Sequence, residues 1–355
     1  MTTTPTSPAA SQQAAVDAAL LVLKSMGLSL ADLTAAPANR RPVPTFAEYV
    51  PVVAATVTPG TLRAYRPYWK RTVVQWGERR LDEPTPSEVK QLVAYVKANA
   101  VPRRNSRGGT HAAENLISAL RCLYNRAVDD GLIEEKDNPA RKVDKPRRMP
   151  STRRALTDKE LAEINQVAAT GDDPELDTLI LRLHTETACR RAGALAIRPR
   201  DLDREKCLIL LREKGETFRW QPVSPTLVAG LVQHAEERHA PPDGQLLRYR
   251  DGRQITERRY DGLWVRLGRE LPWVRTQDVS THWIRHTTLT WVERNFGFAV
   301  AHAYAGHTDG RGESVSVTST YVRATLAEVA TALSALAGEP HPLAQPEGGQ
   351  YDSAG

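Results

Sequence analysis

The sequence predicts a mainly α-helical protein with one small β-sheet, divided into two domains. The chain has 355 residues, of which 41% are apolar and 25% charged. At about 150 residues per domain, that length suggests two domains that can each bury a core. Apolar side chains recur at helical spacing in both halves, and short β-type runs occur together at residues 207–223.

An N-terminal extension, residues 1–43, precedes the first domain. Residues 1–13 are rich in Thr, Ser, Ala and Pro and are expected to be disordered. Residues 14–33 hold enough Leu and Ala for one or two helices.

The first domain, expected at residues 44–143, is helical. One apolar stripe with basic side chains on the other faces predicts a core helix, and its members are Leu62, Tyr65, Trp69, Val73 and Trp76. Thr85 and Glu88 have the spacing of a capping box, with proline at the first helical position. A further helix is expected from about residue 110 to 130, where Gly131 ends it.

A basic linker, residues 144–154, is expected between the domains. Residues 141–154 hold seven basic side chains, one acidic side chain and two prolines, which forbid a continuous helix. An extended segment of this kind suits phosphate tracking, although a flexible spacer is the plain alternative. The candidate DNA-binding residues are Arg147, Arg148, Arg153 and Arg154.

The second domain, expected at residues 155–336, starts with a capping box at Thr157 and Glu160. The runs 207–211 and 218–223 predict a β-hairpin with Lys214 and Gly215 at its turn. Helical patterns surround this hairpin, and residues 337–355 are expected to form a disordered tail. Leu326, Val329, Leu333 and Leu336 mark a short amphipathic helix near the end of the domain.

Composition excludes several classes of protein. No apolar run approaches the roughly 18 residues of a membrane span, and the N-terminus lacks a basic signal-peptide region, so a cytoplasmic protein without membrane contact is expected. Three scattered cysteines and the lack of CxxC or HExxH spacing argue against disulfide scaffolds and metal sites. We expect no cofactor. Residues 44–148 carry 19 basic and 12 acidic side chains, whereas residues 149–335 carry 26 and 25. This excess of positive charge suits a polyanion at the first domain, with a solvated basic face as the plain alternative.

The second domain holds the side chains that metal-free attack on a phosphodiester requires. Arg190 and Arg285 fit two guanidinium groups that stabilise charge on the non-bridging oxygens of the transition state. Tyr321 fits the nucleophile and His282 the base that removes its proton. Lys214, on the hairpin, fits the acid that protonates the leaving 5′ oxygen.

Alternatives stay open at several of these positions. Arg191 competes with Arg190. Tyr304 competes with Tyr321, but it lies in an apolar run that predicts a packed helix, whereas Tyr321 follows a Ser- and Thr-rich loop. His307 is either a hydrogen-bond donor to the phosphate or a buried structural histidine.

These segments, in this order, resemble the boxes of the tyrosine recombinase family, which includes phage integrases and Xer-type resolvases. Residues 282–286 (HWIRH) are similar to its HxxRH box, and residues 187–195 to the box around its first arginine. Lys214 is similar to its hairpin lysine, residues 305–307 (AGH) to its LGH box, and Tyr321 to its nucleophile. The resemblance extends from about residue 45 to 336.

The resemblance implies a helical core-binding domain and a mixed α/β catalytic domain that form a clamp around double-stranded DNA. It implies a site-specific recombinase or integrase that uses a 3′-phosphotyrosyl intermediate without ATP or metal. Four protomers on two DNA sites would be the working assembly, with a mobile element as the setting and an accessory DNA-bending protein as a further partner. The apolar helix near residue 333 would then dock on a neighbouring protomer, with packing on its own domain as the alternative.

Two departures from the family pattern leave rival functions open. Gly193 stands where the family usually has an acidic residue, for which Glu186 is one candidate substitute, and the interval from His307 to Tyr321 is about five residues longer than usual. The rivals are a type IB topoisomerase or telomere resolvase with the same residues, and a catalytically silent DNA-binding regulator.

Overall fold

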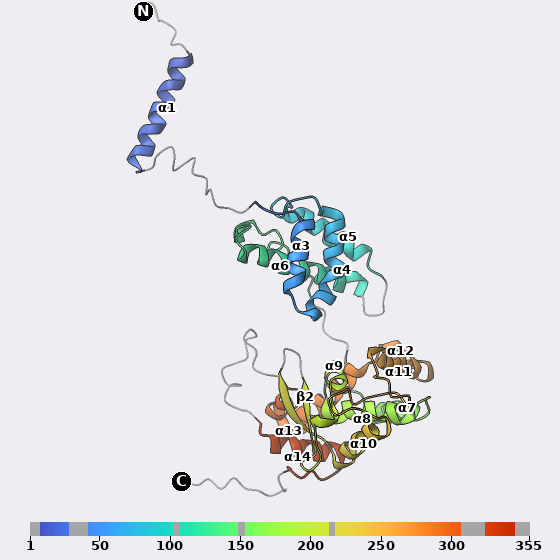
Figure 1. Cartoon of the computed structure of the whole chain (residues 1–355). Helices are drawn as coiled ribbons and strands as arrows, with labels where there is room; N and C mark the ends of the chain where they lie inside the picture. The colour runs from blue at the N-terminus through green and yellow to red at the C-terminus, as the bar shows by residue number, and fades with distance from the viewer. Residues whose placement is uncertain are drawn as a thin grey trace, which may run out of the picture. The chain divides into compact units, whose positions relative to one another are not determined.

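The chain divides into two units, residues 1–149 and 150–355. The structure is a computed structural model that describes residues 8–27, 42–101, 107–147, 153–212, 217–306 and 324–344. Figure 1 shows helices throughout both units and strands in the second one. Since the one sheet of the described residues has three strands, the predicted class, mainly α with a small sheet, is confirmed.

The first unit is helical throughout its described part. Its elements are α1 (Pro8–Ser25), α3 (Phe46–Thr56), α4 (Pro59–Trp76), α5 (Pro86–Ala98), the 3-10 turn η1 (Arg107–Gly109), α6 (Thr110–Asp129) and the 3-10 turn η2 (Glu135–Asp137). Helix α1 includes residues 8–13, for which the sequence predicted disorder.

The core of the first unit follows the predicted stripes. Trp69 and Trp76 of α4 are buried, and the Trp69 indole N–H donates to the Ala119 carbonyl on α6 at 2.9 Å. The capping box of Thr85 and Glu88 forms at the start of α5. Helix α6 ends at the expected place, because Gly131 adopts a left-handed φ of 70° directly after its C-cap residue.

The second unit surrounds a short sheet with helices. Its elements are α7 (Asp158–Ala168), α8 (Pro174–Thr187), α9 (Arg191–Leu195), the 3-10 turn η3 (Pro199–Asp201), β1 (Leu202–Asp203), β2 (Leu208–Arg212), β3 (Phe218–Pro222), α10 (Pro225–Glu237), α11 (Glu257–Glu270), α12 (Pro272–Gln277), α13 (Thr281–Tyr304) and α14 (Leu326–Ala337). Helix α7 opens on the predicted capping box of Thr157 and Glu160.

The predicted hairpin is present. Strands β2 and β3 pair antiparallel, with Leu210 opposite Trp220 and Arg212 opposite Phe218. The short strand β1 adds to the other edge of β2, which the sequence did not predict, because two residues are too few to show a period. The turn of the hairpin, residues 213–216, lies outside the described residues.

Helix α14 packs on its own unit, against α13, α8 and β3. Val329 and Leu333 are buried in a cluster with Val292 and Tyr304 of α13. The structure thus gives this helix a partner within its own domain, the alternative that the sequence left open beside docking on a neighbouring protomer.

Residues 338–344 also pack on the second unit. The expectation of a disordered tail that begins at residue 337 is therefore wrong for these residues. His341 is buried and its Nε2 lies 3.0 Å from the Cys207 carbonyl. Glu339 accepts a hydrogen bond from Arg182 at 2.9 Å. Residues 345–355 lie outside the described part of the chain.

No helix among the described residues has the length and apolar content that crossing a membrane requires.

Candidate active site

Three residues with predicted chemical roles line one pocket of the second unit. Arg190 follows α8, and His282 and Arg285 lie in the first turns of α13. They border a cavity of about 440 Å³. The other lining residues are Cys189, Arg191, Tyr260, Asp261, Trp264, Val265, Asp278, Val279, Ser280 and Thr281. The fold therefore brings two guanidinium groups and an imidazole from distant parts of the sequence to one opening.

Arg190 is presented by a tight turn between α8 and α9. Ala188 ends α8 with a left-handed φ of 48°, a conformation that few residues with a Cβ adopt. The Cys189 amide then donates to the Thr187 hydroxyl at 3.2 Å. Arg190 itself is extended at the start of α9, and its half-buried side chain borders the pocket.

Arg285 is almost fully buried, with 5% of its surface exposed. Its guanidinium donates to the carbonyl of Ala188 and, at 2.8 Å, to the carbonyl of Ala305. Two buried carbonyls therefore fix the plane of this guanidinium and help to offset the cost of burying its charge.

His282 lies one helical turn before Arg285, and its side chain is exposed at the pocket. Partial desolvation by its neighbours lowers the pKa of His282, and the positive charges of Arg153 and Arg285 lower it further. The imidazole is therefore neutral at pH 7 and can accept a proton, as a base for a nucleophilic hydroxyl must.

Arg191, the alternative to Arg190, is held by two ion pairs. Arg191 pairs with Asp261 and Glu257 of α11, each at 3.1 Å. These two carboxylates on α11 hold the Arg191 side chain and offset its charge at the rim of the pocket.

Tyr304 is unsuited to be the nucleophile. It is fully buried, and its hydroxyl donates to the backbone carbonyl of Glu186. Burial raises its pKa far above the ordinary range of a tyrosine. The hydroxyl is thus neither accessible to DNA nor easily deprotonated.

Lys214, His307 and Tyr321 lie outside the described residues. The described neighbours still show where the chain enters residues 307–323. The carbonyl of Ala305 accepts from Arg285, which lines the pocket. Gly306 follows with a left-handed φ of 64°. Because Ala305 contacts Arg285, the chain leaves α13 beside the pocket.

Glu186 does not take the place of the carboxylate expected at Gly193. It is buried and accepts from Arg182 at 2.7 Å and from the backbone N–H of Ser224 at 2.8 Å. Its role is to anchor the start of α10, away from the pocket lining. Gly193 itself is buried in α9, where a Cβ would lie 3.4 Å from the Arg212 carbonyl.

The arginines of the predicted linker have different surroundings. Arg147 is exposed, and Arg148 lies outside the described residues. Arg154 forms a two-point ion pair with Glu160, the capping-box residue of α7, and its hydrogen bonds to the carboxylate lower the pKa of Glu160 to about 2. Arg153 is exposed and close enough to His282 to lower its pKa. The positive charge of Arg153 therefore acts on His282 at the pocket. No local pattern in the sequence indicates this long-range effect.

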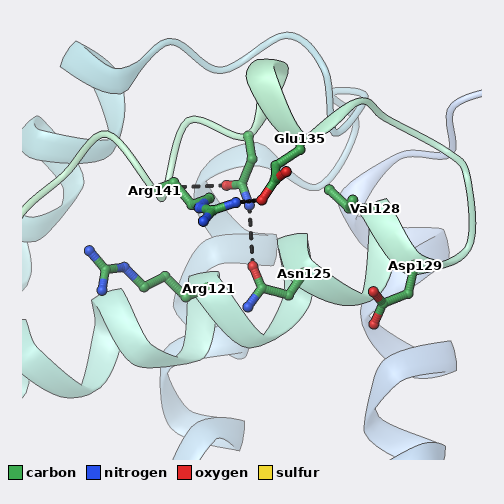
Figure 2. Close-up of a pocket in the computed structure, with 7 residues that line it drawn as sticks. Arg121, Asn125, Val128, Asp129, Glu135 and Arg141 are labelled. Carbon is green, nitrogen blue, oxygen red and sulfur yellow. Dashed lines mark hydrogen bonds and ion pairs between the residues drawn. The ribbon is translucent and has the colours of Figure 1, made fainter.

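A second cavity, of about 510 Å³, lies in the first unit beside α6 and η2 (Figure 2). Arg121 donates to the carbonyls of Ala140 and Val143, and Arg141 pairs with Glu135. The Asn138 side-chain oxygen accepts from the Arg141 backbone N–H at 3.3 Å, and its amide nitrogen donates to the Asn125 side chain at 3.4 Å. These contacts fix the segment that leads to the linker, so this cavity has a structural explanation.

Sequence reasoning missed a buried pair behind Arg190. His184 and Tyr260 are hydrogen-bonded to each other, and their positions on α8 and α11 carry no motif. Among the described residues, no group of three or more His, Cys, Asp or Glu side chains is placed to hold a metal ion.

Known proteins are similar to both units. A model of the phage integrase family matches residues 154–328. The tyrosine recombinase XerC of Xanthomonas axonopodis pv. citri is 26% identical over 269 residues, which are 72% of this chain and 85% of that protein.

Solved structures share the fold. A lambda integrase tetramer bound to a Holliday junction has a TM-score of 0.56 and 14% identity, and covers 86% of this chain and 90% of its own. The Tn1549 transposon integrase (residues 82–397) in complex with circular intermediate DNA has a TM-score of 0.57 and 17% identity, and covers 79% and 95%.

The family match contains the whole pocket described above, because Arg190, His282 and Arg285 all lie within residues 154–328. The XerC relative extends the similarity beyond this segment into most of the chain. The chain belongs to the phage integrase family, the tyrosine recombinases, enzymes that break and rejoin DNA in site-specific recombination.

Proposed function

We propose that this recombinase cleaves DNA with Tyr321 and rejoins it through a 3′-phosphotyrosyl intermediate. The observation that carries the proposal is the gathering of Arg190, His282 and Arg285 at one pocket, beside which the chain enters residues 307–323. Tyr321 lies within that segment.

The chemistry needs no energy source outside the DNA. The Tyr321 oxygen attacks the phosphorus and forms a P–O bond, while the bond to the 5′ oxygen breaks. His282 takes the tyrosine proton and Lys214 gives a proton to the leaving oxygen. Arg190 and Arg285 stabilise the charge that collects on the non-bridging oxygens, and His307 donates a hydrogen bond to them. A 5′ hydroxyl of the partner strand then reverses these steps, so the number of phosphoester bonds is conserved.

Duplex DNA is the proposed partner. Helix α4 presents Arg63, Arg66, Lys70 and Arg71 to solvent and contains no acidic residue. Exposed basic side chains of this kind bind phosphates without reading sequence. In this proposal residues 44–143 bind the core site, residues 144–154 link the domains, and residues 155–336 carry out catalysis, so that the chain forms a clamp on DNA in the cytoplasm.

The proposed assembly is a tetramer on two DNA sites, as in the lambda integrase tetramer bound to a Holliday junction. The Tn1549 relative acts in a transposon, which supports a mobile element as the setting. An accessory DNA-bending protein remains part of the proposal for the full reaction.

Covalent trapping tests the proposal even though the target sequence is unknown. A pool of randomised duplexes, each with a nick that lets the short 5′-hydroxyl product diffuse away, is incubated with the full chain in EDTA, and denaturant-resistant adducts are sequenced. We expect adducts on an enriched site with the wild type and with Tyr304→Phe, and none with Tyr321→Phe.

Each rival function predicts a different result. DNA binding without any adduct would favour the silent regulator. Adducts together with relaxation of supercoiled DNA, but without exchange between two copies of the enriched site, would favour a type IB topoisomerase. Adducts that survive Tyr321→Phe and disappear with Tyr304→Phe would move the nucleophile to Tyr304.

A further inference from the structure

A hydrogen-bonded pair lies behind the turn that presents Arg190. His184, in the last turn of α8, is fully buried, and its Nδ1 lies 3.0 Å from the carbonyl oxygen of Cys189. Its Nε2 lies 3.1 Å from the hydroxyl of Tyr260 on α11. The two rings meet edge to face with their centroids 5.5 Å apart. Tyr260 is 1% exposed and borders the same pocket as Arg190.

The chemistry of the three groups fixes the direction of both hydrogen bonds. A carbonyl oxygen can only accept, so the proton of His184 is on Nδ1. Burial lowers the pKa of His184 to about 4, which keeps the ring neutral at pH 7 and leaves Nε2 as an acceptor. Burial raises the pKa of Tyr260, so its hydroxyl keeps the proton that it donates to Nε2. The chain of donors therefore runs from Tyr260 through His184 to the Cys189 carbonyl.

That carbonyl belongs to the peptide bond that joins Cys189 to Arg190. The preceding carbonyl, of Ala188, accepts from the Arg285 guanidinium. Two successive carbonyls before Arg190 are thus held by two different side chains, one of which is itself held by Tyr260. Ala188 has a left-handed φ of 48°, a conformation that persists only where surrounding contacts support it.

We propose that Tyr260 and His184 are positioning residues that set the direction of Arg190 by holding the Cys189–Arg190 peptide. The inference rests on the proposed role of Arg190 in binding the scissile phosphate. The pair touches no reacting atom. It acts because a guanidinium must meet the phosphate oxygens in a narrow range of positions, and a displacement of about 1 Å can cost about 100-fold in rate.

A double-variant comparison separates positioning from general stability. Tyr260→Phe removes one oxygen and keeps the ring. Single-turnover adduct formation is measured with the full chain on the nicked site enriched by trapping, for the wild type, Tyr260→Phe, Arg190→Lys and the double variant. We expect Tyr260→Phe to slow adduct formation about 10-fold with unchanged DNA affinity, and to slow the Arg190→Lys protein by less than about 2-fold.

Tyr124→Phe is the matched control. Tyr124 is also fully buried, and its hydroxyl donates to the Leu81 carbonyl at 3.1 Å in the first unit. Both variants lose one buried hydroxyl and its hydrogen bond, so similar drops in melting temperature are expected. Only Tyr260→Phe should slow adduct formation.

A pair of His184 variants keeps the inference testable if Tyr260→Phe does not fold. The amide nitrogen of Asn can replace Nδ1 as a donor, whereas Leu has no donor. We expect His184→Asn to keep at least about 5-fold more cleavage activity than His184→Leu at equal folded concentration.

Three results would overturn the inference: an unchanged rate for Tyr260→Phe, an equal loss in the Arg190→Lys background, or equal rates for the two His184 variants. No adduct from the wild-type protein would instead refute the proposed function, so the two failures are distinct.

Discussion

The Arg285 guanidinium donates a hydrogen bond to the carbonyl of Ala305, 20 residues further along the chain, at 2.8 Å. The same guanidinium donates to Ala188, in the turn that leads to Arg190. One buried side chain thus joins the start of α13 to its end and to the Arg190 turn. Arg285 therefore has a structural task in addition to its proposed task at the phosphate.

Alanine variants of the two arginines should both lose activity, and Arg285→Ala should also lose stability. Each should lower the rate of adduct formation about 100-fold or more, the usual cost of removing one donor that stabilises transition-state charge. Arg285→Ala should also lower the free energy of unfolding by about 2 kcal/mol, because it leaves two buried carbonyls without their donor. Urea melts and single-turnover cleavage measure both effects. A free energy of unfolding in Arg285→Ala equal to that of the wild type would contradict the structural task of Arg285.

Gly306→Ala should impair cleavage more than its backbone strain alone would. Gly306 has a φ of 64°, and an added Cβ would overlap the Arg219 side chain, with 2.6 Å to its Cδ. Gly338 has a φ of 67° and nothing within 4 Å of the same position. Gly338→Ala is therefore the control for backbone strain.

We expect both glycine variants to lose about 1 kcal/mol of stability from the left-handed conformation. Only Gly306→Ala should slow adduct formation, because it displaces the start of residues 307–323, which carry Tyr321. If the two variants cleave DNA equally well, the contact with Arg219 has no bearing on the nucleophile.

Stability should fall as the pH is lowered from about 6.5 towards 4. Burial lowers the pKa of both His184 and His234 to about 4, so the unfolded chain binds more protons than the folded chain in that interval. By linkage each histidine costs about 2 kcal/mol of stability at pH 5 relative to pH 7. Unfolding by urea at both pH values measures the difference.

His234→Gln should reduce this pH dependence. His234 Nε2 accepts from the Arg248 backbone N–H at 3.2 Å, and the amide oxygen of Gln can accept in its place. The wild-type protein, measured at the same two pH values, is the reference. An unaltered pH dependence in His234→Gln would show that this histidine does not contribute.

The sequence was sufficient for features that depend on local patterns. The capping boxes at Thr85 and Thr157 and the hairpin strands were predicted because their signals lie within a few residues. Long-range contacts left no such signal. The link from Arg285 to Ala305 and the pair of His184 and Tyr260 join residues 20 and 76 positions apart. The site residues themselves could be proposed from their order and types, but not the carbonyls that hold them.

The linker arginines should contribute unequally to DNA binding. Neutralising Arg147, Arg148, Arg153 and Arg154 together should weaken binding to enriched and random DNA alike and reduce the salt dependence of the affinity. Each lost phosphate contact changes the slope of log K against log salt by about 0.9. Arg154→Ala alone should change the slope little, because Glu160 already pairs with this charge. An unchanged slope in the fourfold variant would mean that the segment is only a spacer.

Helix α14 should stabilise its own unit, so its loss should affect folding before assembly. Leu333 is fully buried against α13, whereas Leu326 on the same helix is 38% exposed. Leu333→Ala should lower the free energy of unfolding by about 2 to 5 kcal/mol and Leu326→Ala by clearly less. Truncation after Arg323 would uncover the cluster around Val292 and Tyr304 and should leave an aggregation-prone chain. Urea melts of dilute, monomeric protein decide the question. If Leu333→Ala leaves the monomer as stable as the wild type but abolishes cooperative occupancy of two half-sites, α14 docks on a neighbouring protomer instead.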